Sequence, residues 1–563
     1  MSNSPISKLS EEALWNLFLE NTDICNASRL NTAIHCSQVC RQWRAIHLES
    51  PSIWGRLVEL DYLQVANIEW VREILARTGN TRLWISGLIS YSKDPVPSFL
   101  LSFLRDNWRR IQKLNIYDRG WNPLQACENR VQYWTTIFQQ PAPSLEEFVF
   151  HYLPNVRDWE APEVWRPPTP LFSGTVPALR RFEFFRIGRR TPSDSKFTMD
   201  MPSLWFSRLR SFTIRQGSDL VQLLEILGMM PLLEELEVHG PGGHLNHHQL
   251  EMSIPAVNLP RLTVIRLPDW PNQYLCMGAF LRCIYPSPRC CLIMARPKYD
   301  AFTTDKEALG KTTIVIAQYA ERYLKHNPAT KITLSRHNDY FSVQEGIASD
   351  PYDVAKIITS QMAVWIYDLE EDNSFAQMIS DTAVVSSVVE IDFRCWEGAP
   401  LSSWSPAFSL SAFNSVTTLW LEETSFFPIW EWLNQVHGSV PLPQLRILKI
   451  GWQQSSLDDQ FASWLYLFLK HRKEQGHPIA IIDFTNVASG KLDCNLDNLE
   501  EFTGLSVKWA AHEGGRIQVV EYKCGNGQPE QLRFKPLTRG RRTLGGLPPT
   551  KSLDDWYGWA GEI

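Results

Sequence analysis

The chain has 563 residues, too many for one ordinary hydrophobic core, so its length predicts several domains or a repeat array. Charged residues (21%) and hydrophobic residues (44%) occur at the levels of soluble folded proteins. The formal net charge of -6 argues against a general binder of nucleic acids or anionic membranes, because both functions need an excess of Lys and Arg.

The N-terminus carries no basic and apolar signal segment before Leu9, and no apolar run reaches the roughly 18 to 20 residues that a membrane helix needs. The 11 cysteines are scattered without regular spacing, which favours reduced thiols. We therefore expect a cytoplasmic or nuclear protein with neither a nucleic acid nor a membrane as partner.

A first short helix is predicted directly after Ser10, which can cap it. Leu14, Leu17 and Phe18 follow at i, i+3 and i+4 and therefore form one apolar stripe along this helix. Leu9 lies just before the cap, where an apolar residue can fold back onto the stripe.

A second helix is predicted over residues 31–47, and the segment 50–52 (Ser-Pro-Ser) ends it before a final apolar anchor at Trp54. The broad apolar side of this helix contains Cys36, Val39, Cys40, Trp43 and Ile46. These helices together comprise fewer than about 50 residues, a length that seldom buries enough surface to be stable alone. A partner or an adjoining domain must therefore supply the missing core.

Two motifs in this stretch carry a family resemblance. They are Leu9-Ser10-Glu11-Glu12-Ala13-Leu14 with Leu17-Phe18, and Val39-Cys40-Arg41-Gln42-Trp43-Arg44 followed by Ser50-Pro51-Ser52-Ile53-Trp54. Over roughly the first tenth of the chain they resemble the F-box, most of all the F-box proteins that are numerous in mushroom-forming fungi. The sequence departs from that family at Ser10, where proline is usual, and at Ala13, where isoleucine or leucine is usual.

The resemblance implies docking onto Skp1, the adaptor of a cullin-RING ubiquitin ligase, with the remaining chain presenting a protein substrate. Leu9, Leu14, Leu17 and Phe18 would lie in or against the Skp1 surface, and Val39, Trp43, Ile46 and Trp54 would pack behind or beside them. Such a protein is a non-catalytic subunit that needs no metal and no cofactor.

The alternative is that the same eight residues only form a small helical core. The protein would then be a repeat scaffold or sensor whose helices cap the array. Exposure separates the two hypotheses, because a cap buries Leu9, Leu17 and Phe18 against the first repeat whereas a docking module leaves them accessible.

A helix-then-strand unit recurs from residue 64 onward. Its strand half has the pattern apolar-x-x-apolar-x-apolar, beginning at Ile111, Leu145, Leu179, Leu209, Leu233 and Leu262 and again at Val388, Val416 and Leu445. Most starts are about 24 to 34 residues apart, which is the range of leucine-rich repeats and their irregular relatives. Each unit has an apolar side that only a neighbouring unit can cover, so stacking is required.

The predicted fold is therefore α/β, with a small helical F-box followed by an irregular leucine-rich-repeat-like α/β solenoid. The domains are expected at residues 1–60 (F-box), 61–488 (solenoid) and 489–563 (a C-terminal cap and tail). Between residues 268 and 387 the repeat register cannot be followed. The cap is predicted to contain a hairpin in which residues 517–522 pair with residues 531–534 across a turn at 525–527.

Candidate sites for chemistry are few. His244, His247 and His248 form the only histidine cluster, but no cysteine or carboxylate at a customary zinc spacing accompanies them, which favours a solvated loop. Cys36 and Cys40 are four residues apart and so share a helix face, where packing is favoured over metal binding. No phosphate loop, dinucleotide loop, nucleophile elbow or helical His-Glu-x-x-His occurs, so we expect no enzyme.

The substrate-binding surface is expected on the outward strand positions of the solenoid. These are Trp84, Glu147, Arg181, Glu183, Glu235, Arg266, Trp420 and Lys449. They mix acidic, basic and aromatic side chains, so they fit either recognition of a protein segment or simply the solvated face of each strand.

Overall fold

A computed structural model provides the structure of this chain. It describes residues 9–23, 28–90, 95–119, 127–153, 167–186, 204–214, 220–239, 255–268, 274–294, 306–337, 340–346, 362–367, 381–394, 412–435, 440–451, 457–487, 491–513 and 516–534. The described residues form a mixed α/β protein with a large, mostly parallel sheet. The chain divides into two compact units, Met1–Val416 and Thr417–Ile563.

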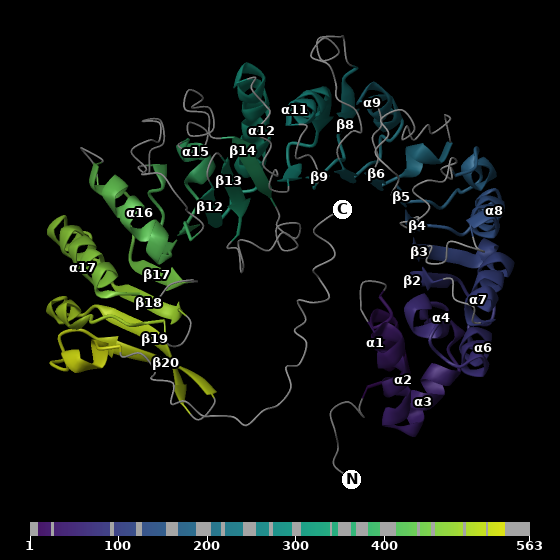
Figure 1. The fold of residues 1–563 in the computed structure, drawn as a ribbon, viewed down its shortest axis with the longest axis horizontal. Helices are drawn as coiled ribbons and strands as arrows, with labels where there is room; N and C mark the ends of the chain where they lie inside the picture. The colour runs from purple at the N-terminus through teal and green to yellow at the C-terminus, as the bar shows by residue number, and fades with distance from the viewer. Residues whose placement is uncertain are drawn as a thin grey trace. The chain divides into compact units, whose positions relative to one another are not determined.

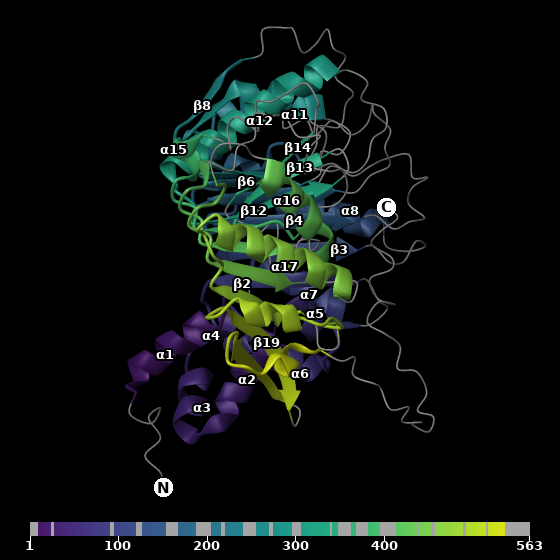
Figure 2. The same cartoon turned by 90° about the vertical axis from the view of Figure 1, so that its left-hand side faces the viewer.

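The first unit begins with short helices that lie together at the N-terminal end of its sheet (Figure 2). They are α1 (Glu11–Glu20), α2 (Arg29–Val39), α3 (Arg41–Leu48) and α4 (Pro51–Gly55), followed by β1 (Val58–Glu59), α5 (Leu60–Leu63) and α6 (Ile68–Arg77). The hydroxyl of Ser10 accepts a hydrogen bond from the Ala13 amide at 3.2 Å, so Ser10 caps α1 as predicted.

The single helix expected over residues 31–47 is wrong. Cys40 has an extended backbone, with φ -156° and ψ 170°, and therefore separates α2 from α3. Its carbonyl accepts a hydrogen bond from the Arg44 amide at 3.0 Å, so Cys40 is the N-cap residue of α3. The apolar spacing continues through this break, which is why the two helices looked like one.

The sheet of the first unit starts with strands that follow one another in chain order. They are β2 (Leu83–Ser90), β3 (Ile111–Arg119), β4 (Glu147–Leu153), β5 (Arg181–Arg186), β6 (Ser211–Ile214), β7 (Glu235–Val238), β9 (Val264–Leu267) and β11 (Cys291–Met294). Each pairs in parallel with the next, and β1 pairs in parallel with β2 at the start.

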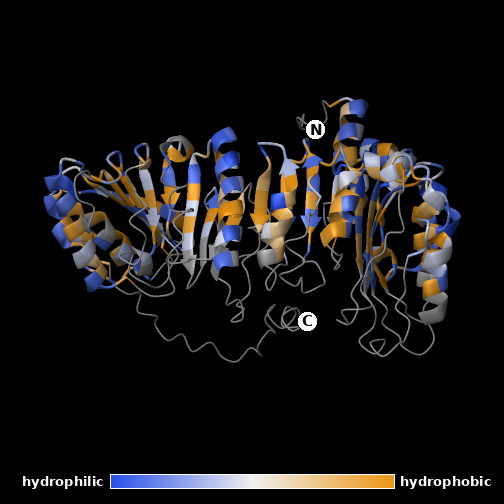
Figure 3. Ribbon diagram, turned by 90° about the horizontal axis from the view of Figure 1, so that it is seen from above, coloured by the Kyte–Doolittle hydropathy of each residue, from blue (hydrophilic) through white to orange (hydrophobic). Residues whose placement is uncertain are grey.

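Helices connect these strands and lie on one face of the sheet (Figure 1). The connecting helices are α7 (Pro95–Asp106), α8 (Cys127–Phe138), α9 (Leu220–Gly228) and α11 (Tyr274–Cys283), with 3-10 turns at η2 (Trp108–Arg110), η4 (Leu171–Gly174) and η5 (Leu204–Arg208). Figure 3 shows hydrophobic residues on strands and helices alike, with hydrophilic bands along the helices. The predicted strands are confirmed. The first apolar residue of each motif is buried, and in all motifs but that of Ile111, where β3 begins, it lies two residues before its strand, as Leu145 and Leu179 do.

Aromatic side chains fill the space between the sheet and its helices. Trp134 of α8 lies 4.7 Å from Phe150 of β4, measured between ring centroids. Phe148 of β4 stacks on Phe182 of β5 at 5.5 Å. The indole nitrogen of Trp134 donates to the buried carboxylate of Asp118 at 2.5 Å, which gives both polar groups a partner inside the core.

The segment where the repeat register was lost has a different topology. β8 (Val257–Leu259) and β10 (Ile284–Pro286) form a separate two-stranded sheet. After α12 (Lys306–His326), the strands β12 (Lys331–His337), β13 (Tyr340–Glu345) and β14 (Ala363–Tyr367) pair antiparallel. Because β14 pairs with β11 while β12 pairs with β15 (Glu390–Asp392), these three strands enter the sheet in reverse chain order.

The second unit repeats the strand-and-helix arrangement. Its elements are β16 (Thr418–Leu421), α16 (Glu423–Gln435), β17 (Ile447–Gly451), α17 (Asp459–Glu474), β18 (Ile481–Asn486), η8 (Asp497–Glu501), β19 (Ser506–Glu513), β20 (Arg516–Lys523) and η9 (Pro529–Leu532). The strands β16 to β19 are parallel neighbours, and β20 runs antiparallel to β19.

The hairpin predicted near the C-terminus is therefore wrong in its partner. β20 pairs with β19, which precedes it, whereas Gln531 lies in the 3-10 turn η9. Gly525 and Gly527 do adopt positive φ, but they lead the chain out of β20 into η9 rather than into a returning strand. The Gly-Asn-Gly sequence correctly marks a turn but does not specify which strand pairs with β20.

Candidate functional site

The eight residues that the F-box resemblance assigns to Skp1 binding fall into three groups. Leu14, Phe18, Ile46 and Trp54 are buried, and Trp43 is half-buried. The exposed ones are Leu9 (41%), Leu17 (45%) and Val39 (63%). The N-terminal helices thus have a small core of their own and leave aliphatic side chains of α1 and α2 in solvent.

Phe18 holds α1 against α3. Its ring centroid lies 5.0 Å from that of Trp43 and 4.3 Å from that of His47. The indole nitrogen of Trp54 donates to the His47 carbonyl at 2.6 Å, which ties α4 to the end of α3. These contacts place Phe18 in the local helical core.

His47 is a buried histidine inside this core. Neither ring nitrogen has a hydrogen-bond partner within the described part of the chain. Burial lowers the pKa of His47 from 6.5 to about 4, because removal from water disfavours the charged imidazolium. The ring is therefore neutral at pH 7 and packs as an apolar group.

A buried polar cluster joins α2 to the first strands of the sheet. The Arg29 guanidinium donates to Glu59 at 3.0 Å and to the Ser86 hydroxyl at 2.5 Å. The same Glu59 oxygen accepts a hydrogen bond from the Leu30 amide at 2.9 Å. Glu59 thereby satisfies an amide at the start of α2, where the N-cap residue Ser28 makes no side-chain hydrogen bond. Because Arg29 is almost fully buried, this cluster fixes the helices to β1 and β2.

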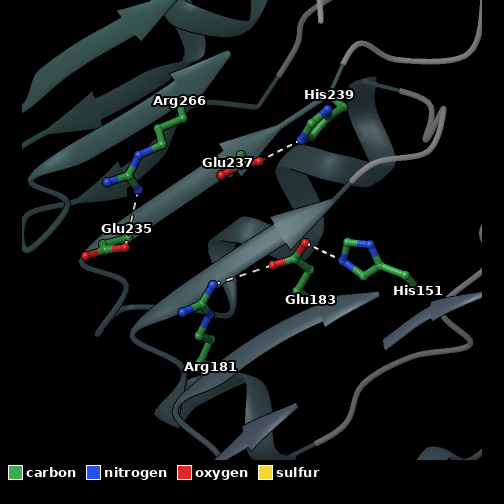
Figure 4. Close-up of polar contacts among 7 residues, drawn as sticks. All are labelled: His151, Arg181, Glu183, Glu235, Glu237, His239 and Arg266. Carbon is green, nitrogen blue, oxygen red and sulfur yellow. Dashed lines mark hydrogen bonds and ion pairs between the residues drawn. The ribbon is translucent and has the colours of Figure 1, made fainter. Parts of the chain in front are cut away.

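A second candidate site lies on the face of the sheet that bears the outward strand positions. His151 of β4 and Glu183 of β5 are both buried and lie 2.8 Å apart between Nε2 and Oε1 (Figure 4). Arg181 approaches the other Glu183 oxygen at 3.6 Å. Glu183 was expected on a solvated surface, and that expectation is wrong, since the carboxylate is enclosed and paired.

The same face continues across β7 and β9 with further ion pairs. Glu237 lies 2.7 Å from His239, and Glu235 lies 3.3 Å from Arg266 (Figure 4). Strand register aligns Glu183 with Thr213 of β6 and Thr213 with Glu237, so these side chains form one row. The row is polar and its charges are largely compensated by neighbours.

Cations cover the outward tryptophans. Trp84 of β2 has Arg56 at 4.2 Å and Lys113 at 4.3 Å from its ring centroid, and Lys113 also pairs with Glu147 at 2.5 Å. In the second unit, Lys449 lies 4.5 Å from the ring of Trp420. Outward residues of both units therefore combine aromatic surface with paired charge, which is a surface suited to hydrogen bonding and stacking with a protein segment.

Metal ligation has little support in the structure. Within the described ranges, no group of three or more His, Cys, Asp or Glu side chains is placed to hold a metal ion. His244, His247 and His248 lie outside those ranges. Cys36 and Cys40 do not share a helix face as predicted, because Cys40 lies in the break between α2 and α3 and is exposed.

None of the helices in the described part of the chain combines the length and the apolarity required to cross a bilayer.

Sequence reasoning missed the residues that organise both sites. Arg29 and Glu59 lie outside the two family motifs, and their pairing depends on β1 joining the sheet. His47 follows Trp43 by four residues and so shares its helix face, a signal that was available. His151 and Glu183 lie on the adjacent strands β4 and β5, where Glu183 is opposite Val149, two residues before His151. Their outward positions in consecutive repeats were the signal for that pair.

A scan against protein-family models finds none that matches this chain, and a search of curated proteins finds no match either. The F-box resemblance accordingly stays a prediction. Function has to be argued from the two candidate sites.

Proposed function

We propose that this protein is a substrate-recognition subunit of a Skp1-cullin-F-box ubiquitin ligase. Its N-terminal helices bind Skp1, and through it a cullin, while the outward face of the sheet holds a protein substrate. The protein itself is not an enzyme and acts in the cytoplasm or nucleus.

The observation that carries this proposal is the exposure of Leu9, Leu17 and Val39. Burying one such aliphatic side chain at an interface is worth roughly 1.5 to 3 kcal/mol at most. Three such residues, Leu9 just before α1, Leu17 on α1 and Val39 at the end of α2, give an apolar partner surface to bury.

The buried members of the set have a supporting role in the proposal. Leu14 and Phe18 are buried, and Phe18 packs on Trp43 of α3, whereas Leu17, at the edge of the same apolar stripe, remains exposed. Ser10 and Ala13, the two departures from the family pattern, are both exposed, so neither disturbs this core.

The substrate side is proposed for the polar row and the covered tryptophans. Paired charges at His151–Glu183 and Glu235–Arg266 favour recognition by shape and hydrogen bonding over attraction to one charge sign. This supports a folded or extended protein segment as ligand, in preference to a nucleic acid.

A second candidate, the repeat scaffold or sensor capped by its N-terminal helices, is favoured by one observation. The buried cluster of Arg29, Glu59 and Ser86 attaches the helices to β1 and β2, as a cap requires. Phe18 is also buried, although against α3 rather than against the sheet.

The deciding experiment is co-expression with Skp1 and measurement of the complex by size-exclusion chromatography with light scattering. We expect a one-to-one complex, and we expect it to be lost when Leu17→Lys and Val39→Lys are combined. The matched control combines Val65→Lys and Leu204→Lys, which change side chains exposed by 85% and 89% elsewhere in the first unit. Absence of any complex with the unmodified chain would make the capped scaffold the leading account.

A further inference from the structure

The outer edge of β20 is an open hydrogen-bonding edge. The Ser506 amide donates to the Ala480 carbonyl, which precedes β18, so the backbone N–H and C=O of Ser506 point away from β20. The backbone groups of the next residue, Val507, therefore face β20, where Val507 is paired with Tyr522. By the alternation of an antiparallel pair, the backbone groups of Ile517, Val519, Glu521 and Lys523 then point away from β19. In the described residues, no N–H or C=O of these four has a partner.

This open edge is also apolar at its centre. Ile517 is 68% exposed and Val519 is 64% exposed, and as residues i and i+2 they point to the same face of the strand. Two usual guards of an edge strand are missing here, since β20 contains no proline and its register with β19 continues without a bulge. Its charged residues, Arg516, Glu521 and Lys523, flank this aliphatic pair. An open, aliphatic edge of this length is a template for another strand.

We propose that the occupant of this edge is β20 of a second copy of the chain, paired antiparallel about a twofold axis at Gln518. A twofold axis perpendicular to the sheet keeps every side chain on its own face, so only residues of the same face can meet. An axis at Gln518 places Ile517 of each copy opposite Val519 of the other. An axis at Val519 would instead place Ile517 opposite the charged Glu521, so the aliphatic match selects the first register.

The proposed interface is therefore isologous and continues the sheet from one copy into the other. The outward backbone groups of Ile517 and Val519 in each copy exchange hydrogen bonds, and the exposed aliphatic side chains bury each other. This inference concerns the second unit and does not depend on Skp1 binding by the N-terminal helices.

The first test is sedimentation equilibrium of the full-length chain over a dilution series. We expect a reversible monomer–dimer equilibrium, and we expect Ile517→Lys with Val519→Lys to give monomer only. The control pair Val65→Lys with Leu204→Lys changes even more exposed side chains in the first unit and should dimerise like the unmodified chain. Circular dichroism checks that each variant is folded.

The second test fixes the register. Gln518→Cys places one thiol from each copy directly across the axis, in a non-hydrogen-bonded pair whose Cα atoms are about 4.5 Å apart, within reach of a disulfide. Mild oxidation should therefore give a covalent dimer on non-reducing gels, above the background of the unmodified chain. Val520→Cys, two residues from the axis, should not cross-link.

Several results would overturn the proposal. A monomer at every concentration would mean that the edge is covered by another segment of this chain or belongs to a different partner. A dimer that survives the double lysine change would place the interface elsewhere. Cross-linking through Val520→Cys but not Gln518→Cys would exclude this register.

Discussion

The N-terminal helices and the sheet of β2 to β7 solve the same problem of covering apolar surface in different ways. In the sheet, each strand is covered by the next strand and by a helix of its own unit, so Phe148, Phe182 and Phe212 stack in a continuous row. In the helices, the core consists of a few rings around Phe18, and aliphatic residues remain outside.

This difference indicates which region is expected to bind a partner. A repeated core is self-sufficient, because every unit has a neighbour of the same kind. A helical core of fewer than about 50 residues is not stable by itself. The N-terminal helices gain stability from the Arg29 cluster, which attaches them to the sheet, and they have exposed aliphatic residues that a partner can bury. The comparison can be tested by substitutions that should affect the two regions to different degrees.

The largest effect is expected from Trp134→Ala in the sheet core. The change removes the contacts with Phe150 and leaves the buried Asp118 carboxylate without the indole donor. We expect a loss of roughly 3 to 5 kcal/mol in the free energy of unfolding, measured by urea denaturation. Trp84→Ala is the matched control, because Trp84 is only half-buried and packs against side chains of Arg56 and Lys113. Equal losses for both variants would refute the idea of a tightly packed sheet core.

A smaller effect, dependent on pH, is expected in the helices at His47. Its pKa is about 4 when folded and near 6.5 when unfolded, so the unfolded chain binds more protons between these values. The stability that depends on neutral His47 is complete above pH 6.5 and is lost as the pH falls toward 4, by up to about 3 kcal/mol. Urea denaturation at several pH values measures this loss.

The control for this prediction is His47→Leu, which keeps an apolar side chain of similar extent and cannot be protonated. Its free energy of unfolding should vary less between pH 7 and pH 4 than that of the unmodified chain. The same slope in both proteins would show that other groups, not His47, cause the acid sensitivity.

The strands of the fold could be predicted because they depend on local periodicity. The motif beginning at Leu145 or Leu209 has its apolar residues at positions that only an inward-facing strand satisfies, and the structure places β4 and β6 there. The strands β12 to β14 could not be ordered in this way, since pairing of β14 with β11 involves residues about 70 positions apart and leaves no periodic signal. The partner of β20 was missed for a different reason. β19 directly precedes β20, and the sequence Gly514-Gly515 between them is itself a hairpin signal, but the prediction used the turn at 525–527 instead.

The candidate sites were predictable only in part. The residue types of the apolar stripe on α1 were visible, but the sequence could not separate the buried Phe18 from the exposed Leu17 without the position of α3. Glu147 and Glu183 are both outward residues, but strand register aligns Glu183 with the buried Val149 and aligns Glu147 with Arg181. The repeat pattern therefore did not indicate that Glu183 is enclosed beside His151. Burial of a polar side chain is a tertiary property, so periodicity alone assigns it wrongly.

The smallest effect is expected from Leu17→Lys. Leu17 is already in solvent in the free chain, and substitutions at such positions usually change the free energy of unfolding by no more than about 0.5 kcal/mol. Leu14→Ala, three residues away on the buried side of α1, should cost about 2 to 5 kcal/mol because it opens a cavity in the small core. Urea denaturation of the two variants therefore separates surface from core on a single helix. If Leu17→Lys were as destabilising as Leu14→Ala, Leu17 would belong to the core, and the exposed apolar residues on which the proposed Skp1 binding rests would be reduced to Leu9 and Val39.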